Sequence, residues 1–194
     1  YKSYCAHLKY KSQDLGQYDG IGNYEGKQTK SWDNSKLDII SDIVNIPVQD
    51  GSFDAIMCIE VFEHISEPAM AIKEFSRILR SGGKLIITAP FSSITHFAPF
   101  YFANGYSKYW YEKILPEHRF TIDEININGN YFEWLAQEVR RIPTVTEDRQ
   151  WEKLKFSDRV IQTLMLKMLA RLSKKDRSSN KILCHGIHIL ATKE

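Results

Sequence analysis

The middle of the chain contains two continuous apolar runs with an amphipathic segment between them. Phe53 to Ile59 is apolar apart from Asp54, and Lys84 to Ala89 is a second such run, a pattern typical of strands covered on both faces. Between them, apolar residues recur at helical spacing: Ala71, Ile72, Phe75, Ile78 and Leu79. Ser66 is the expected N-cap of this helix and Gly82-Gly83 its expected stop. The order strand, helix, strand predicts a right-handed crossover between two parallel strands.

Weaker patterns extend this alternation toward both ends of the chain. Further strands are expected at Leu8 to Asp14, Leu37 to Ile40, Thr121 to Ile127 and Ile187 to Thr192. Further helices are expected at 106–115, at 131–141 with Pro143 ending it, and along an apolar stripe from Leu154 to Leu172. Residues 17–35 are polar and glycine-rich, which predicts a long mobile loop. The pattern as a whole predicts an α/β, doubly wound sheet that binds its ligand at the carboxyl ends of the strands.

Composition narrows the class of protein. The 194 residues, 43% of them hydrophobic and 26% charged, fit one soluble domain, and no apolar run is long enough to span a membrane. No signal-peptide pattern begins the chain, so a cytoplasmic location is expected. Lys and Arg number 26 against 24 Asp and Glu, a balance that disfavours a nucleic-acid partner. The three cysteines, Cys5, Cys58 and Cys184, fit no metal spacing and suit a reducing compartment.

Several short motifs follow one another in a specific order. They are Ser41-Asp42-Ile43 with Ile46-Pro47, Asp50-Gly51-Ser52-Phe53-Asp54, Glu60-Val61-Phe62-Glu63-His64, and Arg77-Ile78-Leu79-Arg80-Ser81-Gly82-Gly83-Lys84-Leu85. Together they resemble the class I S-adenosylmethionine-dependent methyltransferases, especially the subgroup of quinone-biosynthesis enzymes. The resemblance implies a Rossmann-like sheet, S-adenosylmethionine as cofactor and methyl transfer as the activity.

The resemblance also assigns cofactor-binding roles to individual residues. Asp14 corresponds to the acid that accepts hydrogen bonds from both ribose hydroxyls, and Asp42 to the acid that accepts from the adenine amino group. Ile43 supplies a backbone amide and an apolar side to the adenine ring, and Ile59 and Glu60 close the pocket near the sulfonium. The alternative for both aspartates is local turn or cap chemistry.

The chain departs from the family pattern at its start. No strand and Gly-x-Gly loop precede Asp14, and Gly20-x-Gly22-x-x-x-Gly26 has the wrong spacing and follows the ribose acid. The resemblance therefore implies that the first strand lay upstream of Tyr1, between the strand ending at Asp14 and the one from Phe53 to Ile59. We expect one methyltransferase domain over 1–194, incomplete at its N-terminus, with a substrate lid at 91–118.

Two histidines are the expected catalytic residues. His64 and His96 each follow one of the two central strands, and an imidazole titrates near neutral pH and can act as a base. The alternative for each is a hydrogen-bonded structural histidine. Glu60, Glu63 and His64 also resemble the Glu-x-x-Glu-His of the small-RNA 2′-O-methyltransferases, where a divalent ion lies beside the substrate hydroxyl, and His96 could add a ligand. Metal-free relatives share similar sequences, so no metal ligand is counted among the expected site residues.

The methyl acceptor is defined only by class. Aromatic residues crowd the expected lid: Phe97, Phe100, Tyr101, Phe102, Tyr106, Tyr109, Trp110 and Tyr111. They suit either stacking of a small-molecule or glycan-like acceptor or a small satellite core. The main alternative function is a non-catalytic scaffold or interaction module. An NAD or nucleotide-sugar enzyme would need a Gly-x-Gly-x-x-Gly that the chain lacks.

Overall fold

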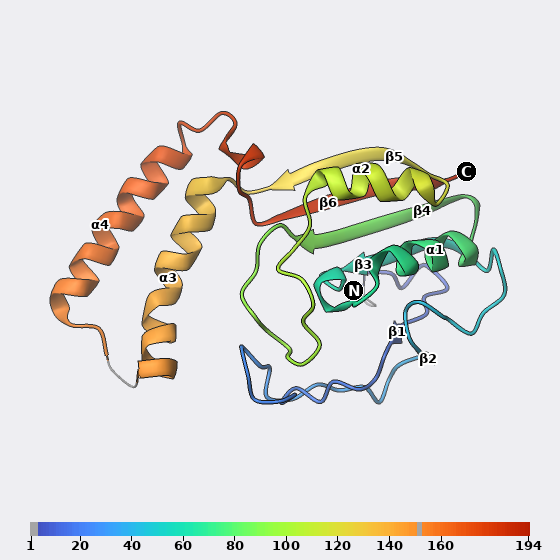
Figure 1. The fold of residues 1–194 in the computed structure, drawn as a ribbon, viewed down its shortest axis with the longest axis horizontal. Coiled ribbons are helices and arrows are strands. Elements are labelled where there is room, and N and C mark those ends of the chain that lie inside the picture. Colours follow the sequence, from blue (N-terminus) through green and yellow to red (C-terminus); the bar gives the residue numbers. More distant parts are fainter. Residues whose placement is uncertain (1–3, 151–152) are drawn as a thin grey trace. The chain divides into compact units, whose positions relative to one another are not determined.

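The computed structural model describes residues 4–150 and 153–194 as an α/β protein (Figure 1). Its strands are β1 (Gln13–Asp14), β2 (Ile39–Ile40), β3 (Phe53–Ile59), β4 (Leu79–Pro90), β5 (Phe120–Asn128) and β6 (Gly186–Lys193). Its α-helices are α1 (Pro68–Ile78), α2 (Lys108–Glu117), α3 (Tyr131–Gln150) and α4 (Phe156–Ser173), with short 3-10 helices η1 (Phe62–His64) and η2 (Ser179–Lys181). The expected α/β class is confirmed.

The strands form two sheets. One has the order β3-β4-β6-β5, and β1 pairs with β2 in the other. β3 and β4 are parallel neighbours, with Ile59 opposite Thr88, as the central strand-helix-strand pattern predicts. β6 runs against its neighbours β4 and β5, so the larger sheet is mixed (Figure 1). Among the described residues no strand pairs with the outer edge of β3, the edge beside which the resemblance implies a further strand.

Both ends of α1 differ from the prediction. The N-cap is Glu67 rather than Ser66, and α1 ends at Ile78, before the two glycines. Gly82 and Gly83 lie inside β4, where the register shifts from Phe53 opposite Leu79 to Ala55 opposite Lys84. A positive φ of 75° at Gly82 and the close approach of Gly83 to the Arg80 carbonyl explain why glycine is used here. The Gly-Gly pair therefore forms an irregularity in the strand and does not stop the helix.

One side chain of α1 ties the helix to the preceding loop. The Arg77 guanidinium donates to the carbonyl oxygens of Ile46 (2.9 Å) and Val48 (2.8 Å), to Asp50 (2.7 Å) and to Glu74 (2.7 Å). The buried Glu74 carboxylate also accepts from the Ile46 amide at 2.7 Å. These bonds hold the pKa of Glu74 below its usual value, with the Arg77 bond as the largest cause. Motif residues 46–50 and Arg77 thus form a structural clamp.

The first two strands are shorter than predicted, and the loop between them is folded against a distant segment. β1 and β2 have two residues each. Within residues 17–35, the Asn23 amide donates to Ala98 and the Lys27 amide to Thr95, while the Phe97 amide donates back to Lys27. A Cβ on Gly22 would lie 2.0 Å from the Ala98 carbonyl oxygen, so glycine is required for this close approach.

The chain divides into two compact units, one reaching Ile125 and including His188–Glu194, the other spanning Asn126–Ile187. In the first, α1 packs against β4 and α2, over a core that includes Phe62, Leu85, Ile87 and Tyr111. In the second, α3 and α4 form an antiparallel pair around Ala136, Val139 and Leu169 (Figure 1). The single domain over 1–194 stays a prediction, as does the lid at 91–118.

The expected end of α3 at Pro143 is wrong, because the helix continues to Gln150. A proline at position 143 has no amide hydrogen to donate to the carbonyl four residues earlier, that of Val139. The Gln162 side chain of α4 donates to this carbonyl at 2.7 Å. A partner on the neighbouring helix therefore satisfies the oxygen that the proline leaves free, and the helix can pass through this position.

Candidate functional site

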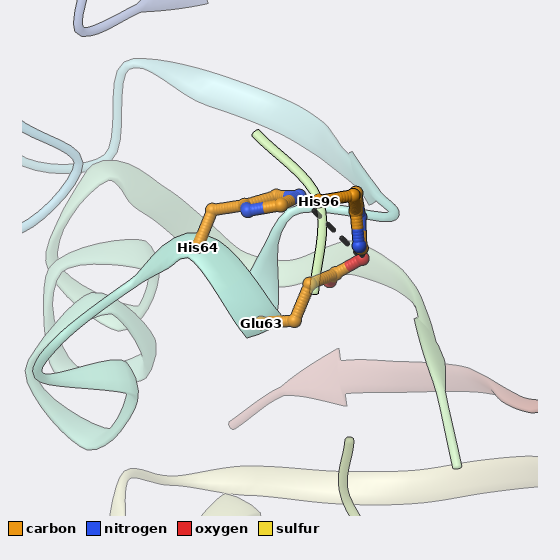
Figure 2. A group of neighbouring side chains, drawn as sticks. All are labelled: Glu63, His64 and His96. Carbon is orange, nitrogen blue, oxygen red and sulfur yellow. Dashed lines mark ion pairs between the residues drawn. The ribbon is translucent and has the colours of Figure 1, made fainter. Parts of the chain in front are cut away.

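Glu63, His64 and His96 meet just beyond the carboxyl ends of β3 and β4 (Figure 2). Glu63 and His64 belong to η1, which begins three residues after β3, and His96 lies on the segment that follows β4. One carboxylate oxygen, Glu63 Oε1, lies 3.7 Å from Nε2 of His64 and 3.6 Å from Nε2 of His96. The two expected catalytic histidines are thus brought together, with their imidazole centroids 4.7 Å apart.

Backbone carbonyls fix the tautomer of both histidines. Nδ1 of His64 lies 2.5 Å from the carbonyl oxygen of Phe100, and Nδ1 of His96 lies 2.8 Å from that of Ile94. A carbonyl oxygen can only accept, so each Nδ1 carries the hydrogen and donates it. Nε2 is therefore the nitrogen of each ring that can take up a proton or bind a cation.

The cluster holds buried polar atoms that lack hydrogen-bond partners. Glu63 is only 2% exposed, and within the described part of the chain neither its Oε2 nor Nε2 of His64 has a hydrogen-bond partner. An unpaired buried polar group costs about 1–3 kcal/mol, and more when it is charged. Such a cost at the carboxyl edge of parallel strands is typical of a site that is completed by a ligand.

The pKa values of the two imidazoles are shifted in opposite directions by this environment. Burial lowers the pKa of His64, and the Phe100 carbonyl and Glu63 only partly offset this effect. The pKa of His96 is raised, chiefly by its interaction with the Glu63 carboxylate. Near neutral pH, this favours an unprotonated His64 beside a His96 that retains its proton more readily. Burial also raises the pKa of the nearby Cys58 thiol, which therefore stays protonated.

Glu60 lies outside the cluster, although the motif would group it with Glu63 and His64. It directly follows β3 and has a positive φ of 53°, an uncommon backbone conformation for a side-chain-bearing residue. Its side chain is exposed and accepts a hydrogen bond from the Thr88 hydroxyl at 2.7 Å. The turn after β3 thus directs Glu60 and Glu63 to different places, and His96 takes the third position in the cluster.

An aromatic wall stands beside the histidines, consisting of Tyr18, Trp32, Phe97 and Tyr101. Phe97 is stacked between His64 (5.2 Å) and Tyr18 (4.8 Å), and Trp32 meets its edge at 5.7 Å. Three other expected lid aromatics, Tyr106, Trp110 and Tyr111, pack against the buried Phe62 instead. Phe102 and Tyr109 are exposed. Part of the aromatic-rich segment therefore forms a satellite core with α2, and stacking of an acceptor on the aromatic wall stays a prediction.

The predicted cofactor residues follow the ends of three strands. Asp14 ends β1 and accepts from the Gly16 amide at 2.8 Å, and Asp42 follows β2 and accepts from the Val44 amide at 3.1 Å. Both carboxylates thus make the local turn bonds that were the alternative explanation. A carboxylate accepts several hydrogen bonds, so this does not conflict with a bound ribose or adenine. Ile43 and Ile59 are half-buried, and the cofactor roles of all five residues stay predictions.

Sequence reasoning missed Tyr18, Trp32 and the bonding between residues 17–35 and 94–98. The signal was present in the glycines of that loop, since Gly22 and Gly26 have positive φ and abut the carbonyls of Ala98 and Thr95. A glycine-rich polar stretch predicts that the backbone can adopt unusual conformations. It does not indicate which distant segment of the chain packs against those glycines.

Comparison with known proteins finds methyltransferases among the similar sequences. Residues 17–87 match the family described as methyltransferase domain. A ubiquinone biosynthesis O-methyltransferase of Xanthomonas oryzae pv. oryzae is 45% identical over 40 residues, 21% of this chain and 17% of that protein. The demethylmenaquinone methyltransferase of Renibacterium salmoninarum is 31% identical over 113 residues, 58% of this chain and 44% of that protein. The chain thus spans less than half the length of these curated relatives.

A solved structure shows a more distant likeness. The geranyl diphosphate C-methyltransferase of Streptomyces coelicolor A3(2) has a TM-score of 0.44 at 13% identity, over 80% of this chain and 52% of that one. The motifs, the parallel pairing of β3 with β4 and the methyltransferase-domain match agree with one another. Over residues 17–87 the chain is thus similar to the class I S-adenosylmethionine-dependent methyltransferases.

Proposed function

We propose that the protein transfers a methyl group from S-adenosylmethionine to a small-molecule or glycan-like acceptor at the Glu63–His64–His96 cluster. The observation that carries this proposal is the convergence of two imidazole Nε2 atoms on a buried carboxylate, beyond the carboxyl ends of a parallel strand pair. Ligands of α/β sheets bind at that edge. The cofactor supplies the reactive methyl group.

The residues of this chain would bind and align the reactants. Asp14 and Asp42 hold the ribose and adenine of the cofactor, and Ile43, Ile59 and Glu60 line the rest of its pocket. Nε2 of His96, the more exposed of the two rings, accepts the proton that the acceptor loses, while Glu63 orients that ring. The wall of Tyr18, Trp32, Phe97 and Tyr101 offers flat faces against which an acceptor can stack.

A transfer assay on the gene-encoded protein tests the proposal. Labelled S-adenosylmethionine is incubated with a panel of phenolic, catecholic and sugar-like acceptors, with His96→Asn as the test variant and His188→Asn, an exposed histidine on β6, as the matched control. We expect a roughly 10²-fold or larger loss for His96→Asn, the usual contribution of a general base, and no loss for the control. Binding of S-adenosylhomocysteine without transfer to any acceptor would favour the scaffold alternative.

A second candidate property, a divalent-cation site at the same cluster, is favoured by one geometric fact. The Glu63–His64 and Glu63–His96 separations of 3.7 and 3.6 Å are long for hydrogen bonds. Two ligands of one tetrahedral ion at about 2.0–2.1 Å lie roughly 3.3 Å apart, close to these values. The carboxylate and two imidazoles lie within 4.8 Å of one another, and such a donor set suits first-row divalent metals.

The fit extends to the outer contacts of the donors. In metal sites a ligating histidine commonly donates its other N–H to a backbone carbonyl, as both rings do here. Glu63, His64 and His96 would hold the cation, which would polarise an acceptor hydroxyl and lower its pKa.

Equilibrium dialysis against Zn²⁺ and Mn²⁺ separately tests this second property without reference to activity. We expect one equivalent of one of these ions bound by the wild-type protein and by His188→Asn, and binding at least about tenfold weaker in Glu63→Gln and His96→Asn. Equal retention by all four proteins, or no retention by any, would rule out the cation site and leave the proposed base chemistry standing.

A further inference from the structure

Helix α4 has an inner face and a very different outer face. The inner face carries Leu169 and Leu166, which pack on the Ala136–Val139 cluster of α3, and Gln162, which bonds to Val139. These positions recur at three- and four-residue spacing and define a single stripe toward α3. The pairing is antiparallel, since Asn130 at the start of α3 bonds to Ser173 at the end of α4.

The outer face of α4 is apolar and exposed. Phe156 is 85%, Leu164 60% and Ile161 57% exposed. The full set of exposed large apolar residues on this helix is Phe156, Val160, Ile161, Leu164, Met165 and Met168. Four of them recur every four residues and the other two flank that row, so they form one continuous outer stripe. A contiguous exposed apolar stripe on a helix is typical of an interaction surface.

Basic residues lie at both ends of this stripe and among its C-terminal positions. Residues 153–177 hold eight lysines and arginines and only two acids, Asp158 and Asp176, a net charge of +6. The whole chain has 26 basic and 24 acidic residues, so the remainder has 18 against 22 and is net acidic. All eight basic side chains are exposed: Lys153, Lys155, Arg159, Lys167, Arg171, Lys174, Lys175 and Arg177. The positive charge of the protein is thus concentrated on and beside α4.

We propose that the outer face of α4 binds an anionic lipid membrane, with the helix lying in the plane of the interface. A helix that exposes Leu, Ile, Met and Phe side chains among Lys and Arg side chains has the composition of such an anchor. The apolar side chains enter the boundary between headgroups and acyl chains, and the basic side chains meet the negative headgroups. Among the described residues, none of the helices combines the length and the hydropathy that a membrane span needs.

Charge complementarity favours this occupant over a second copy of the helix. Two copies of α4 packed face to face would bring two basic rims together, which is unfavourable. Asp158, one of the two acids, is occupied at the helix start, where its carboxylate accepts from the Lys155 amide at 3.0 Å. A membrane leaflet rich in acidic lipid offers the negative charge and the apolar interior that match this face.

Co-sedimentation of the full chain with vesicles tests the proposal. The probes are vesicles of phosphatidylcholine alone and of phosphatidylcholine mixed with phosphatidylglycerol, at low and high salt. We expect saturable binding to the mixed vesicles that weakens as salt rises, and little binding to the neutral ones. The variant Ile161→Gln with Leu164→Gln should lower vesicle affinity at least about tenfold, because two apolar side chains no longer enter the interface.

Matched variants separate the outer stripe from apolar exposure in general. Ile182→Gln removes a side chain that is 72% exposed but lies outside α4, and it should leave vesicle binding unchanged. Lys167→Glu with Arg171→Glu should reduce binding to the mixed vesicles by at least about tenfold. The proposal is overturned if wild-type protein fails to bind mixed vesicles, binds neutral ones equally well, or instead forms a dimer that Ile161→Gln with Leu164→Gln abolishes.

Discussion

At the scale of single residues, Glu63 lies between two imidazoles that it affects unequally. Both Nε2 atoms point toward the same carboxylate oxygen, yet His64 is dominated by burial and His96 by the carboxylate. A neutral imidazole, a carboxylate and a second imidazole that is readily protonated form an arrangement in which a proton can be held near an acceptor. The same arrangement without that proton is a donor set for a cation.

The opposite pKa shifts of His64 and His96 predict the order in which the two histidines titrate. By NMR, assigned through the His64→Asn and His96→Asn variants, the pKa of His96 should lie above 6.5 and that of His64 below it. Because its folded pKa is depressed, His64 contributes stability that is present above pH 6.5 and is lost as pH falls. His96, with a raised folded pKa, contributes stability that is present below pH 6.5 and is lost as pH rises through its folded pKa.

Glu63→Gln provides the internal check on this titration. It removes the carboxylate charge but keeps the size of the side chain, so the pKa of His96 should fall markedly while that of His64 stays depressed by burial. A reversed order in the wild-type protein, or a His96 pKa that does not respond to Glu63→Gln, would contradict the electrostatic description of the cluster.

At the scale of elements, α1 is held by its Arg77 clamp, and the loss of this clamp should be costly. Arg77→Met keeps the apolar stem but leaves the buried Glu74 carboxylate without its ion pair and frees two backbone carbonyls. We expect the free energy of unfolding in urea to fall by about 2–3 kcal/mol, as for a partly buried charge left unpaired. Arg80→Met, which breaks an exposed pair with Asp54, should cost no more than about 1 kcal/mol.

The two substitutions differ in burial and not in chemistry, which makes the comparison informative. Equal effects of Arg77→Met and Arg80→Met on the urea midpoint would mean that the clamp adds nothing beyond a surface ion pair. A restored midpoint in Arg77→Met combined with Glu74→Met would instead support the account, because the orphaned carboxylate would then be absent.

The continuation of α3 through Pro143 predicts an energetic coupling between two helices. Gln162→Ala should cost about 1 kcal/mol in the wild-type protein, because the Val139 carbonyl loses its partner. In a Pro143→Ala background, the new amide at position 143 can donate to Val139, so Gln162→Ala should cost clearly less. A double-mutant cycle of unfolding free energies measures this coupling, and additive effects would contradict it.

Several elements could be predicted from the sequence because their information is local. β3 has the predicted bounds, Phe53–Ile59, since a continuous apolar run determines a buried strand by itself. The path through Gly82-Gly83 and Pro143 could not be predicted, because glycine and proline act through partners elsewhere in the chain, β3 in one case and Gln162 in the other. β1 and β2 are short, and their pairing depends on only two residues each.

The candidate site was predictable in part for the same reason. Strand order places residues after β3 and β4 at one edge, so His64 and His96 could be expected near each other. The exclusion of Glu60 depends on a single positive φ, and the aromatic wall depends on contacts between residues 17–35 and 94–98. Neither feature leaves a periodic signature in the sequence.

At the scale of the whole molecule, the parts have distinct roles in this account. The unit that contains β3 and β4 carries the candidate catalytic cluster and the predicted cofactor residues, and Asn126–Ile187 carries the proposed membrane-binding face. The order β3-β4-β6-β5 leaves one edge of β3 without a strand among the described residues, and β1-β2 forms a sheet of its own. The proposed methyl transfer requires a cofactor that bridges residues following β1, β2 and β3.

Isothermal titration of S-adenosylhomocysteine into the gene-encoded protein tests that dependence most directly. Asp14→Ala and Asp42→Ala should each weaken binding by about 1.5–3 kcal/mol, the value of a hydrogen bond to a charged group. Asp33→Ala, an exposed aspartate that makes a similar turn bond to the Ser35 amide, is the matched control and should bind as the wild type does. Affinity that is unchanged in both test variants, or no binding by the wild-type protein, would contradict the account.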